Sequence, residues 1–217
     1  MNEELSQILR TGANEIGTPL SAPQVDKFAL YLSELKRWNK KINLTSLNED
    51  REIVVKHFLD SLTPLSHIPM GSFIMDLGSG GGLPGIPMKI ARPDIRILLL
   101  DSTGKKVSFL NHMITLLKFK NARALQQRAD SEVFQEIMSG HLDVVIARAF
   151  GKIEKTLEVG APYLKVGGKL IVMKGPNWAE EKKAKCERLG LSLTDVIELV
   201  LPVMEIKRAL LIYTRKS

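Results

Sequence analysis

A glycine-rich stretch between two aspartates that lie 25 positions apart carries the clearest chemistry in the sequence. Residues 76–87 read DLGSGGGLPGIP, and they include the end of the apolar run that begins at Phe73. Glycines let the backbone approach a ligand closely, and the first N–H groups of a helix beyond such a turn can bind it. Asp101 closes the next apolar run, near the spacing at which a carboxylate accepts hydrogen bonds from a ribose diol. Asp76, Gly78, Gly80 and Asp101 together predict a nucleoside-binding site, although each aspartate alone could equally cap a helix.

The charge beside this turn indicates which nucleoside binds. Gly80, Gly82 and Gly85 match the G-x-G-x-x-G of dinucleotide enzymes, but a single match of this kind is weak evidence. Asp76 would repel a pyrophosphate and attract the ammonium of an amino-acid moiety. Two prolines at the start of the expected helix make the turn long and rigid. These features favour S-adenosylmethionine (AdoMet) over NAD as the cofactor.

Charged residues at the ends of later strands extend the candidate site. Arg128, Ala129 and Asp130 follow the third expected strand, where folds of this kind contact an adenine edge. Asp130 could also cap the helix that starts near residue 132. Arg148 ends the fourth strand, so its guanidinium is delivered to the carboxyl edge of the sheet, where open α/β sheets place their sites. Lys174 ends the fifth strand and could reach a phosphate, but a surface lysine is normally just solvated, so its position alone does not make it a site residue.

The elements that must position these residues follow from the spacing of apolar side chains. Short apolar runs predict buried strands, and apolar residues three and four apart predict helices. The strand-like runs are 73–77, 95–101, 122–126, 142–147, 169–173, 192–201 and 209–214, and the helical stretches include 22–42, 53–62, 105–118 and 153–164. Alternation of strand and helix implies a mostly parallel α/β sheet covered on both faces, whereas the last two runs leave room only for an antiparallel hairpin. The first seventy residues look all-helical, with Ser21 as the cap of the helix at 22.

Length and composition bound the kind of protein. A chain of 217 residues, 44% hydrophobic and 25% charged, fits one domain with some elaboration around a sizeable core. The acidic start and the lack of a long apolar run predict a cytoplasmic protein that does not contact a membrane. The single cysteine, Cys186, is expected to be a solvent-facing or half-buried thiol on a helix, with no catalytic role. A net charge of +7 attracts polyanions, so nucleic acid is a candidate partner.

Two basic stretches could supply phosphate contacts. The first surrounds Trp38 and contains Lys36, Arg37, Lys40, Lys41 and Arg51; the second contains Lys182, Lys183, Lys185 and Arg188. The alternative to phosphate contacts is that the lysines form a solvated rim. We expect Trp38 itself to anchor the apolar stripe of its helix to the core. His57 and Asp60 could meet on one helix face, but two such residues do not make a metal site. This pair is expected to dock the helical N-terminal region on the core, and contact with RNA stays open as an alternative.

Several separate motifs, in a fixed order along the chain, resemble one known family. They are WNKKINLT at 38–45, HFLDS at 57–61, the glycine-rich stretch at 76–87, Leu100-Asp101-Ser102, Ala147-Arg148-Ala149-Phe150 and Met173-Lys174-Gly175. This combination closely resembles ribosomal RNA small subunit methyltransferase G, also called the glucose-inhibited division protein B family. The resemblance covers nearly the whole chain.

The resemblance implies a Rossmann-like class I AdoMet-dependent methyltransferase with a seven-stranded sheet, in which a helical N-terminal extension, 1–70, precedes a methyltransferase core, 71–217. The family methylates the N7 of a guanine in 16S ribosomal RNA. The implied cofactor is therefore AdoMet, and the implied partner of an expected monomer is 16S ribosomal RNA or the small ribosomal subunit. Carried over by motif, the implied cofactor contacts are Gly78, Leu83, Ala129, Asp130 and Arg148, which join Asp76, Gly80, Asp101 and Ser102 in the predicted cofactor site. The family's basic residues that affect activity fall on Lys105, Arg128, Arg148 and Lys174.

The expected chemistry needs alignment rather than proton transfer. A guanine N7 carries an unprotonated lone pair, so the enzyme must align the nucleophile, the methyl group and the sulfur, and no general base is required. Our hypothesis is that Arg148 mainly orders the cofactor and Lys174 the RNA. The alternatives are an AdoMet enzyme with another substrate and an RNA-binding ribosome assembly factor that keeps the fold, with an NAD-dependent oxidoreductase as a distant third. The sequence leaves open which guanine is modified and whether naked RNA or an assembled subunit is the substrate.

Overall fold

The apolar runs of the sequence form the strands of one sheet in the structure, a computed structural model that describes residues 1–180 and 186–217. The strands are β1 (Phe73–Leu77), β2 (Arg96–Asp101), β3 (Ala122–Gln126), β4 (Leu142–Arg148), β5 (Leu164–Lys174), β6 (Leu191–Leu201) and β7 (Ile206–Arg215). The α-helices are α1 (Glu3–Glu15), α2 (Ala22–Ile42), α3 (Asp50–Ile53), α4 (Asp60–Leu62), α5 (Gly85–Ala91), α6 (Gly104–Leu116), α7 (Glu132–Met138) and α8 (Ile153–Gly160). A π-helical segment, Val54–Leu59, joins α3 to α4, and 3₁₀ turns lie at Leu65–His67, Ala161–Tyr163, Pro176–Glu180 and Cys186–Leu189.

The sheet has the strand order β3-β2-β1-β4-β5-β7-β6. Its first five strands in this order are parallel, and β7 runs antiparallel to both β5 and β6. The prediction of a mostly parallel seven-stranded sheet with a terminal antiparallel hairpin is confirmed. The chain reverses its direction of winding between β1 and β4, and open sheets bind their ligands at the carboxyl ends of the strands beside such a point.

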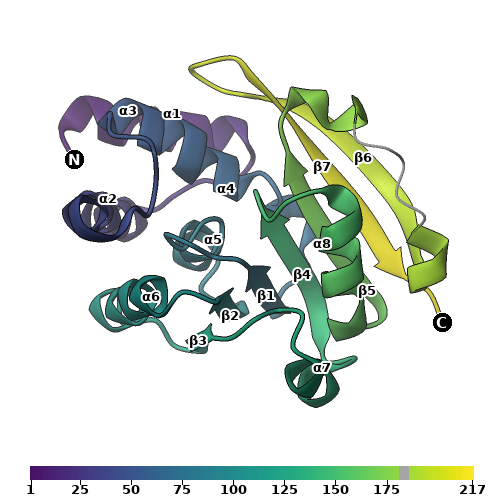
Figure 1. Ribbon diagram of the computed structural model, residues 1–217. Coiled ribbons are helices and arrows are strands. Elements are labelled where there is room, and N and C mark those ends of the chain that lie inside the picture. Colours follow the sequence, from purple (N-terminus) through teal and green to yellow (C-terminus); the bar gives the residue numbers. More distant parts are fainter. Residues whose placement is uncertain (181–185) are drawn as a thin grey trace.

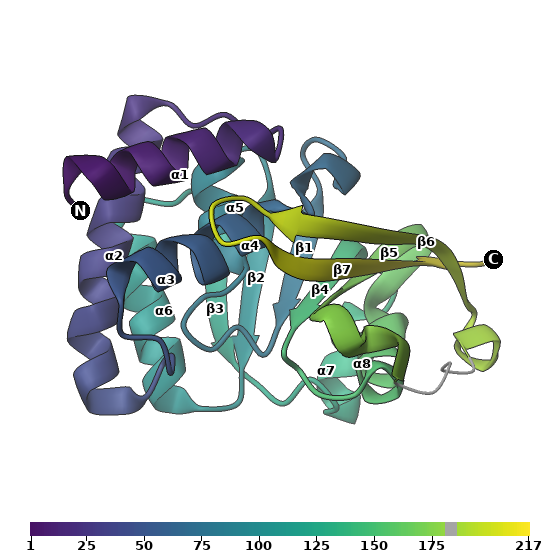
Figure 2. The ribbon, with the colours of Figure 1, turned by 90° about the horizontal axis from the view of Figure 1, so that it is seen from above.

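The strands contribute apolar side chains to two layers, one on each face of the sheet, because neighbouring residues of a strand point to opposite faces. On β1, Ile74 belongs to one layer and Met75 to the other, and Val144 and Val145 of β4 divide in the same way. The first layer packs against α1 to α6, and the second packs against α7 and α8. Figures 1 and 2 show the N-terminal helices beside α5 and α6, away from α7 and α8.

The N-terminal helices share their core with the rest of the chain. Leu9 of α1 and Phe28 of α2 belong to the same buried cluster as Ile74, Ile86 and Ile212. At the start of α2, the side chain of Gln24 accepts a hydrogen bond from the backbone N–H of Ser21 (2.8 Å), so the predicted cap is present as a capping box. The amide of Gln24 also donates to the last carbonyls of α5, at residues 90 and 91, which fixes α2 against the sheet's covering helix.

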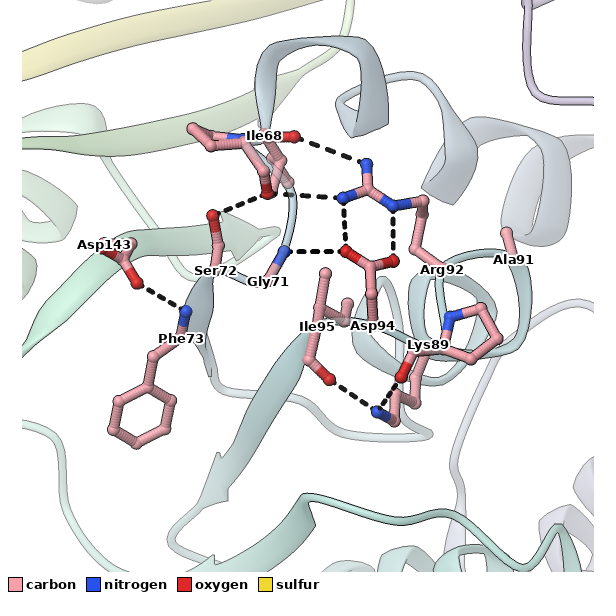
Figure 3. A network of polar contacts seen from close by, with 12 residues as sticks. Ile68, Gly71, Ser72, Phe73, Lys89, Ala91, Arg92, Asp94, Ile95 and Asp143 are labelled. Atoms are coloured by element: carbon pink, nitrogen blue, oxygen red, sulfur yellow. Dashed lines mark hydrogen bonds and ion pairs between the residues drawn. The ribbon is translucent and has the colours of Figure 1, made fainter.

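A polar network lies at the amino ends of β1 and β2, opposite the carboxyl ends of the strands where the site is predicted (Figure 3). Arg92 donates two hydrogen bonds of 2.7 Å to Asp94, and Asp94 accepts a third from the backbone N–H of Gly71. These donors hold the pKa of Asp94 well below its usual range. The buried ammonium of Lys89 donates to two backbone carbonyls beside the start of β2. The network ties the helical region to the sheet at the edge away from the predicted site.

Among the described residues, no helix combines the length and the apolar character that crossing a bilayer requires.

Candidate active site

The glycine-rich turn connects β1 to α5 as the sequence predicts. Gly78 adopts a left-handed backbone (φ 70°), and a Cβ atom there would lie 2.7 Å from the ring of Phe150. A Cβ atom on Gly85 would lie 2.3 Å from Leu99 and 2.7 Å from Asp76. Both positions therefore require glycine, the first for conformation and space and the second for space alone. At these two positions, the side chains of Phe150, Leu99 and Asp76 occupy the space that a Cβ atom would need.

Asp76 lies beneath this turn, fully buried, rather than at its open side. One carboxylate oxygen, Oδ2, accepts a hydrogen bond of 3.0 Å from the N–H of Gly85, the first residue of α5. The N-cap residue of α5 is Pro84, so the interpretation of Asp76 as the N-cap of this helix is wrong. The other oxygen, Oδ1, is the buried side-chain atom that lacks a hydrogen-bond partner among the described residues. Burial raises the pKa of Asp76 to about 7. The carboxyl group thus has an unmet demand for a donor.

Asp101 ends β2 and joins two backbone segments. Its carboxylate accepts from the N–H of Gly80 (3.0 Å) and from the N–H of Thr103 (2.8 Å), and the ammonium of Lys106 lies 3.9 Å away. Thr103, not Asp101, is the N-cap residue of α6. The helix-capping alternative for Asp101 is therefore wrong, because the carboxylate bridges the glycine turn to the loop after β2.

A cavity of about 390 Å³ opens at the carboxyl ends of these strands. Of the residues predicted to bind the cofactor or to support activity, it is lined by Gly78, Asp101, Ser102, Arg128, Ala129 and Asp130. Leu83 faces away and packs against the layer that contains the N-terminal helices. Lining residues that sequence reasoning missed include Lys106, Gln127, Phe150, Lys155 and Val159.

Lys105 is exposed outside this cavity, and its neighbour Lys106 lines it instead. Which of two adjacent lysines faces a site depends on the phase of the helix, and the apolar spacing of α6 did not specify that phase. The apolar pattern does not separate the two lysines, because Lys105 and Lys106 each stand four residues before a buried side chain, Phe109 and Leu110.

Arg128 and Asp130 form an exposed pair at the rim of the cavity. The guanidinium of Arg128 donates two hydrogen bonds of 3.0 Å to the carboxylate of Asp130. Ser131 is the N-cap residue of α7, so the interpretation of Asp130 as the cap of that helix is wrong. Ala129, between them, is buried.

A second pocket, of about 290 Å³, adjoins the first on the side of the N-terminal helices. It is lined by Asp60, Arg148, Ala149, Met173, Lys174, Gly175 and Arg208. Ala149 lines both cavities, in a left-handed conformation (φ 53°) that is costly for a residue with a Cβ atom. Lys174 donates a hydrogen bond of 2.8 Å to the carbonyl of Gly151, which lies in the loop between β4 and α8.

The guanidinium of Arg148 is held by the N-terminal region. It lies 3.3 Å from the carboxylate of Asp60, and it donates to the carbonyl of Lys56 (2.7 Å) and to Nδ1 of His57 (2.8 Å). Arg208 donates to the same carboxylate, at 3.1 Å. Burial raises the pKa of Asp60 and the two guanidiniums lower it, with burial the larger effect. The expectation that His57 and Asp60 dock the N-terminal helices on the core is confirmed.

His57 is a neutral acceptor in this arrangement. Because arginine can only donate, Nδ1 of His57 accepts from Arg148, and Nε2 carries the proton toward the hydroxyl of Thr45, 2.6 Å away. Burial and the charge of Arg148 lower the pKa of His57 to about 3. The π-helical segment presents the carbonyl of Lys56 to Arg148, and such segments often occur at functional sites.

Trp38, Cys186 and the two basic stretches were the other residues singled out in the sequence, and two of them, Trp38 and Cys186, pack in the interior. Trp38 packs against Phe109, with ring centres 5.6 Å apart, which confirms its interpretation as a core anchor. Cys186 is buried within a 3₁₀ turn, so the expectation of a solvent-facing or half-buried thiol is wrong. In the first basic stretch, Lys36 pairs with Asp50. Three residues of the second stretch, at 182, 183 and 185, lie outside the described residues.

Comparison with known proteins places this geometry in a family. The model of the family described as rRNA small subunit methyltransferase G matches residues 24–211. The chain belongs to this family. A protein of that name from Geobacter metallireducens is 36% identical over 220 residues, which is 100% of this chain and 99% of the relative. Another, from Geotalea uraniireducens, is 38% identical over 215 residues, 98% of this chain and 97% of the relative.

Solved structures share the fold of this family member at low sequence identity. A SAM-dependent methyltransferase from Aquifex aeolicus superimposes with a TM-score of 0.57 at 15% identity and covers 84% of this chain and 98% of its own. A putative methyltransferase in complex with the Haloferax volcanii Trm112 activator gives a TM-score of 0.60 at 16% identity and covers 85% and 98%. The predicted Rossmann-like methyltransferase fold is confirmed.

Proposed function

We propose that the chain is an AdoMet-dependent methyltransferase that transfers a methyl group to the N7 of a guanine in 16S ribosomal RNA. The observation that carries this proposal is the pair of adjoining cavities at the carboxyl edge of the sheet in a member of the rRNA small subunit methyltransferase G family. One cavity has the features of a nucleoside site, and the other is lined by cations. A methyl donor and an RNA base must meet at the boundary between two such sites.

The first cavity fits AdoMet. Its volume lies within the roughly 300–1,000 Å³ typical of ligand pockets. Asp101 presents a carboxylate to a ribose diol, and Ala129 and Asp130 form the wall where an adenine edge would lie. Asp76 does not line this cavity, but its carboxylate lies buried under the glycine turn, and its negative charge would attract the ammonium of the methionine end across the turn. Gly78, Gly80 and Ser102 complete the proposed cofactor site.

The second cavity fits a guanine nucleotide of RNA. Arg208 and Lys174 line it, and cations there suit a phosphate or the O6 of guanine. Arg148 also lines it, but most of its donors are bound to Asp60, Lys56 and His57. We therefore propose that Arg148 fixes the wall between the two cavities through Ala149, and that Lys174 contacts the RNA.

The chemistry follows from alignment. When bound, AdoMet supplies a methyl group on a positively charged sulfur, which the N7 lone pair attacks in line. This chain contributes the fixed positions of the two cavities, with Ala149 between them, and needs no proton acceptor at N7. Arg128, on the exposed rim, and Lys105, outside the cavity, are assigned to RNA phosphates rather than to the reacting atoms.

The test is transfer of labelled methyl from AdoMet to small subunits from cells that lack this protein, followed by nucleoside analysis. The expected product is 7-methylguanosine in 16S ribosomal RNA. Methyl in another nucleoside would reject the guanine N7 assignment, and AdoMet binding without transfer would favour the ribosome assembly factor. Parallel reactions with deproteinised 16S ribosomal RNA establish which form of the substrate is used, and sedimentation tests the expected monomer.

A further inference from the structure

Two of the three tyrosines in the chain lie fully buried on opposite faces of the sheet and make the same kind of contact. Tyr31, on α2, donates its hydroxyl to the carbonyl of Gly81 at 2.5 Å. Tyr163, in the 3₁₀ turn after α8, donates its hydroxyl to the carbonyl of Ala129, also at 2.5 Å. Gly81 belongs to the glycine-rich turn, and Ala129 lines the cofactor cavity.

We propose that Tyr31 and Tyr163 are positioning residues that pin the two backbone segments between which the cofactor binds. This inference rests on the proposed assignment of the first cavity to AdoMet. Tyr31 holds the turn after β1 from the layer of the N-terminal helices, and Tyr163 holds the turn after β3 from the other layer.

The glycine turn needs such an external hold. A run of glycines has no side chains of its own to pack, and it loses more conformational freedom on ordering than any other sequence. Gly81 instead packs against Leu35 of α2, whose Cδ1 lies 3.2 Å from the position of a Cβ atom, and receives the hydroxyl of Tyr31. A site whose backbone is ordered before the ligand arrives binds more tightly, because binding does not have to supply that order.

The two phenol rings are themselves fixed. Tyr31 stacks on Phe58, with ring centres 5.1 Å apart, and Tyr163 packs on Phe134 at 5.7 Å. Burial raises the pKa of Tyr163 to about 12 and raises that of Tyr31 well above its usual value, so both hydroxyls keep the proton that they donate. A rigid ring with a permanent donor sets the position of its carbonyl partner.

The experiment compares Tyr31→Phe and Tyr163→Phe with a matched control, Tyr213→Phe. Tyr213 is also buried, but it lies on β7 and lines neither cavity. Phenylalanine keeps the ring and removes only the hydroxyl. Calorimetric titration with AdoMet is expected to give a dissociation constant about fivefold higher for each of the first two variants, the factor that corresponds to one net hydrogen bond. The double variant is expected to lose about 25-fold, because the two contacts are separate.

A second measurement separates positioning from general stability. In methyl-transfer assays, the KM for AdoMet rises in Tyr31→Phe and Tyr163→Phe, while the KM for small subunits and the rate at saturating AdoMet stay at the wild-type values. Hydrogen exchange speeds up at residues 78–83 in the first variant and at 129–131 in the second, whereas Tyr213→Phe changes neither segment. The two tyrosines test the same idea independently, so a folding defect in one variant leaves the other decisive.

Two kinds of failure are distinguishable. If the wild-type protein binds no AdoMet, the proposed function fails. If the wild type binds AdoMet and the folded Tyr31→Phe and Tyr163→Phe proteins bind it equally well, the positioning proposal fails alone.

Discussion

Replacing Asp76 by asparagine tests the account of the buried carboxyl group under the glycine turn. Asparagine keeps the shape and one oxygen for the N–H of Gly85 but cannot ionise. In the wild type, the pKa rises from 3.8 to about 7 on folding. The folded state therefore holds this proton more tightly than the unfolded state, and stability falls as the pH rises between these values. At full effect the shift corresponds to about 4 kcal/mol, since one pKa unit is about 1.4 kcal/mol.

The assay is urea unfolding of the ligand-free wild type and Asp76→Asn at pH 5, 6, 7 and 8. The free energy of unfolding of Asp76→Asn, relative to wild type, is expected to increase by about 2 to 3 kcal/mol between pH 5 and pH 7, and then to level off. AdoMet binding is expected to weaken in the same variant, because the negative charge under the glycine turn no longer attracts the ammonium. Removing the charge thus stabilises the empty protein at neutral pH and impairs its site.

Asp94→Asn is the matched control, since Arg92 lowers the pKa of Asp94 instead of raising it. A depressed pKa contributes stability above the unfolded pKa of about 3.9, which is lost only as the pH falls further. Asp94→Asn should therefore cost the same free energy at every pH from 5 to 8. A difference between wild type and Asp76→Asn that does not change with pH would refute the reasoning.

Three further predictions concern the residues around the two cavities. Asp60→Ala leaves the guanidinium of Arg148 buried without its carboxylate, and urea unfolding should show a loss of about 3–5 kcal/mol, with a smaller loss in Asp60→Asn. Lys106→Ala should raise the dissociation constant for AdoMet in calorimetry, whereas Lys105→Ala should leave it unchanged, because only the former lines the cavity; the reverse ranking would contradict the structure. His57, with a pKa of about 3, should show no titration of its ring signals by NMR between pH 5 and 8. Its neutral form contributes stability that is present above the unfolded pKa of about 6.5 and declines as the pH falls below it.

The sequence predicted the sheet well because its signals are local. The apolar runs begin and end within a few residues of the strands, and Asp101, Arg148 and Lys174 stand at strand ends as expected. In a parallel sheet those ends meet at one edge, so strand position alone brings their side chains toward one site.

The contacts that define the site in detail are long-range, and no local pattern reports them. Tyr31 and Gly81 are 50 positions apart, and Arg148 and His57 are 91 apart. The sequence also did not predict that Asp76 is buried, because an aspartate at a strand end followed by glycines can place its carboxylate either on the open side of the turn or beneath it. Which side it takes depends on how α2 and α5 pack over the turn, and that packing is tertiary.

The shared core of the N-terminal helices and the sheet limits how this protein can be recombined. Leu9 and Phe28 pack in the same cluster as Ile74, Ile86 and Ile212, and Tyr31 reaches the glycine turn from the same layer. A chimera that joins residues 1–70 of one relative to the sheet of another would bring together side chains that were never fitted to each other. Exchange between relatives at this boundary would succeed only if the facing residues of β1, α5 and β7 were exchanged with the helices.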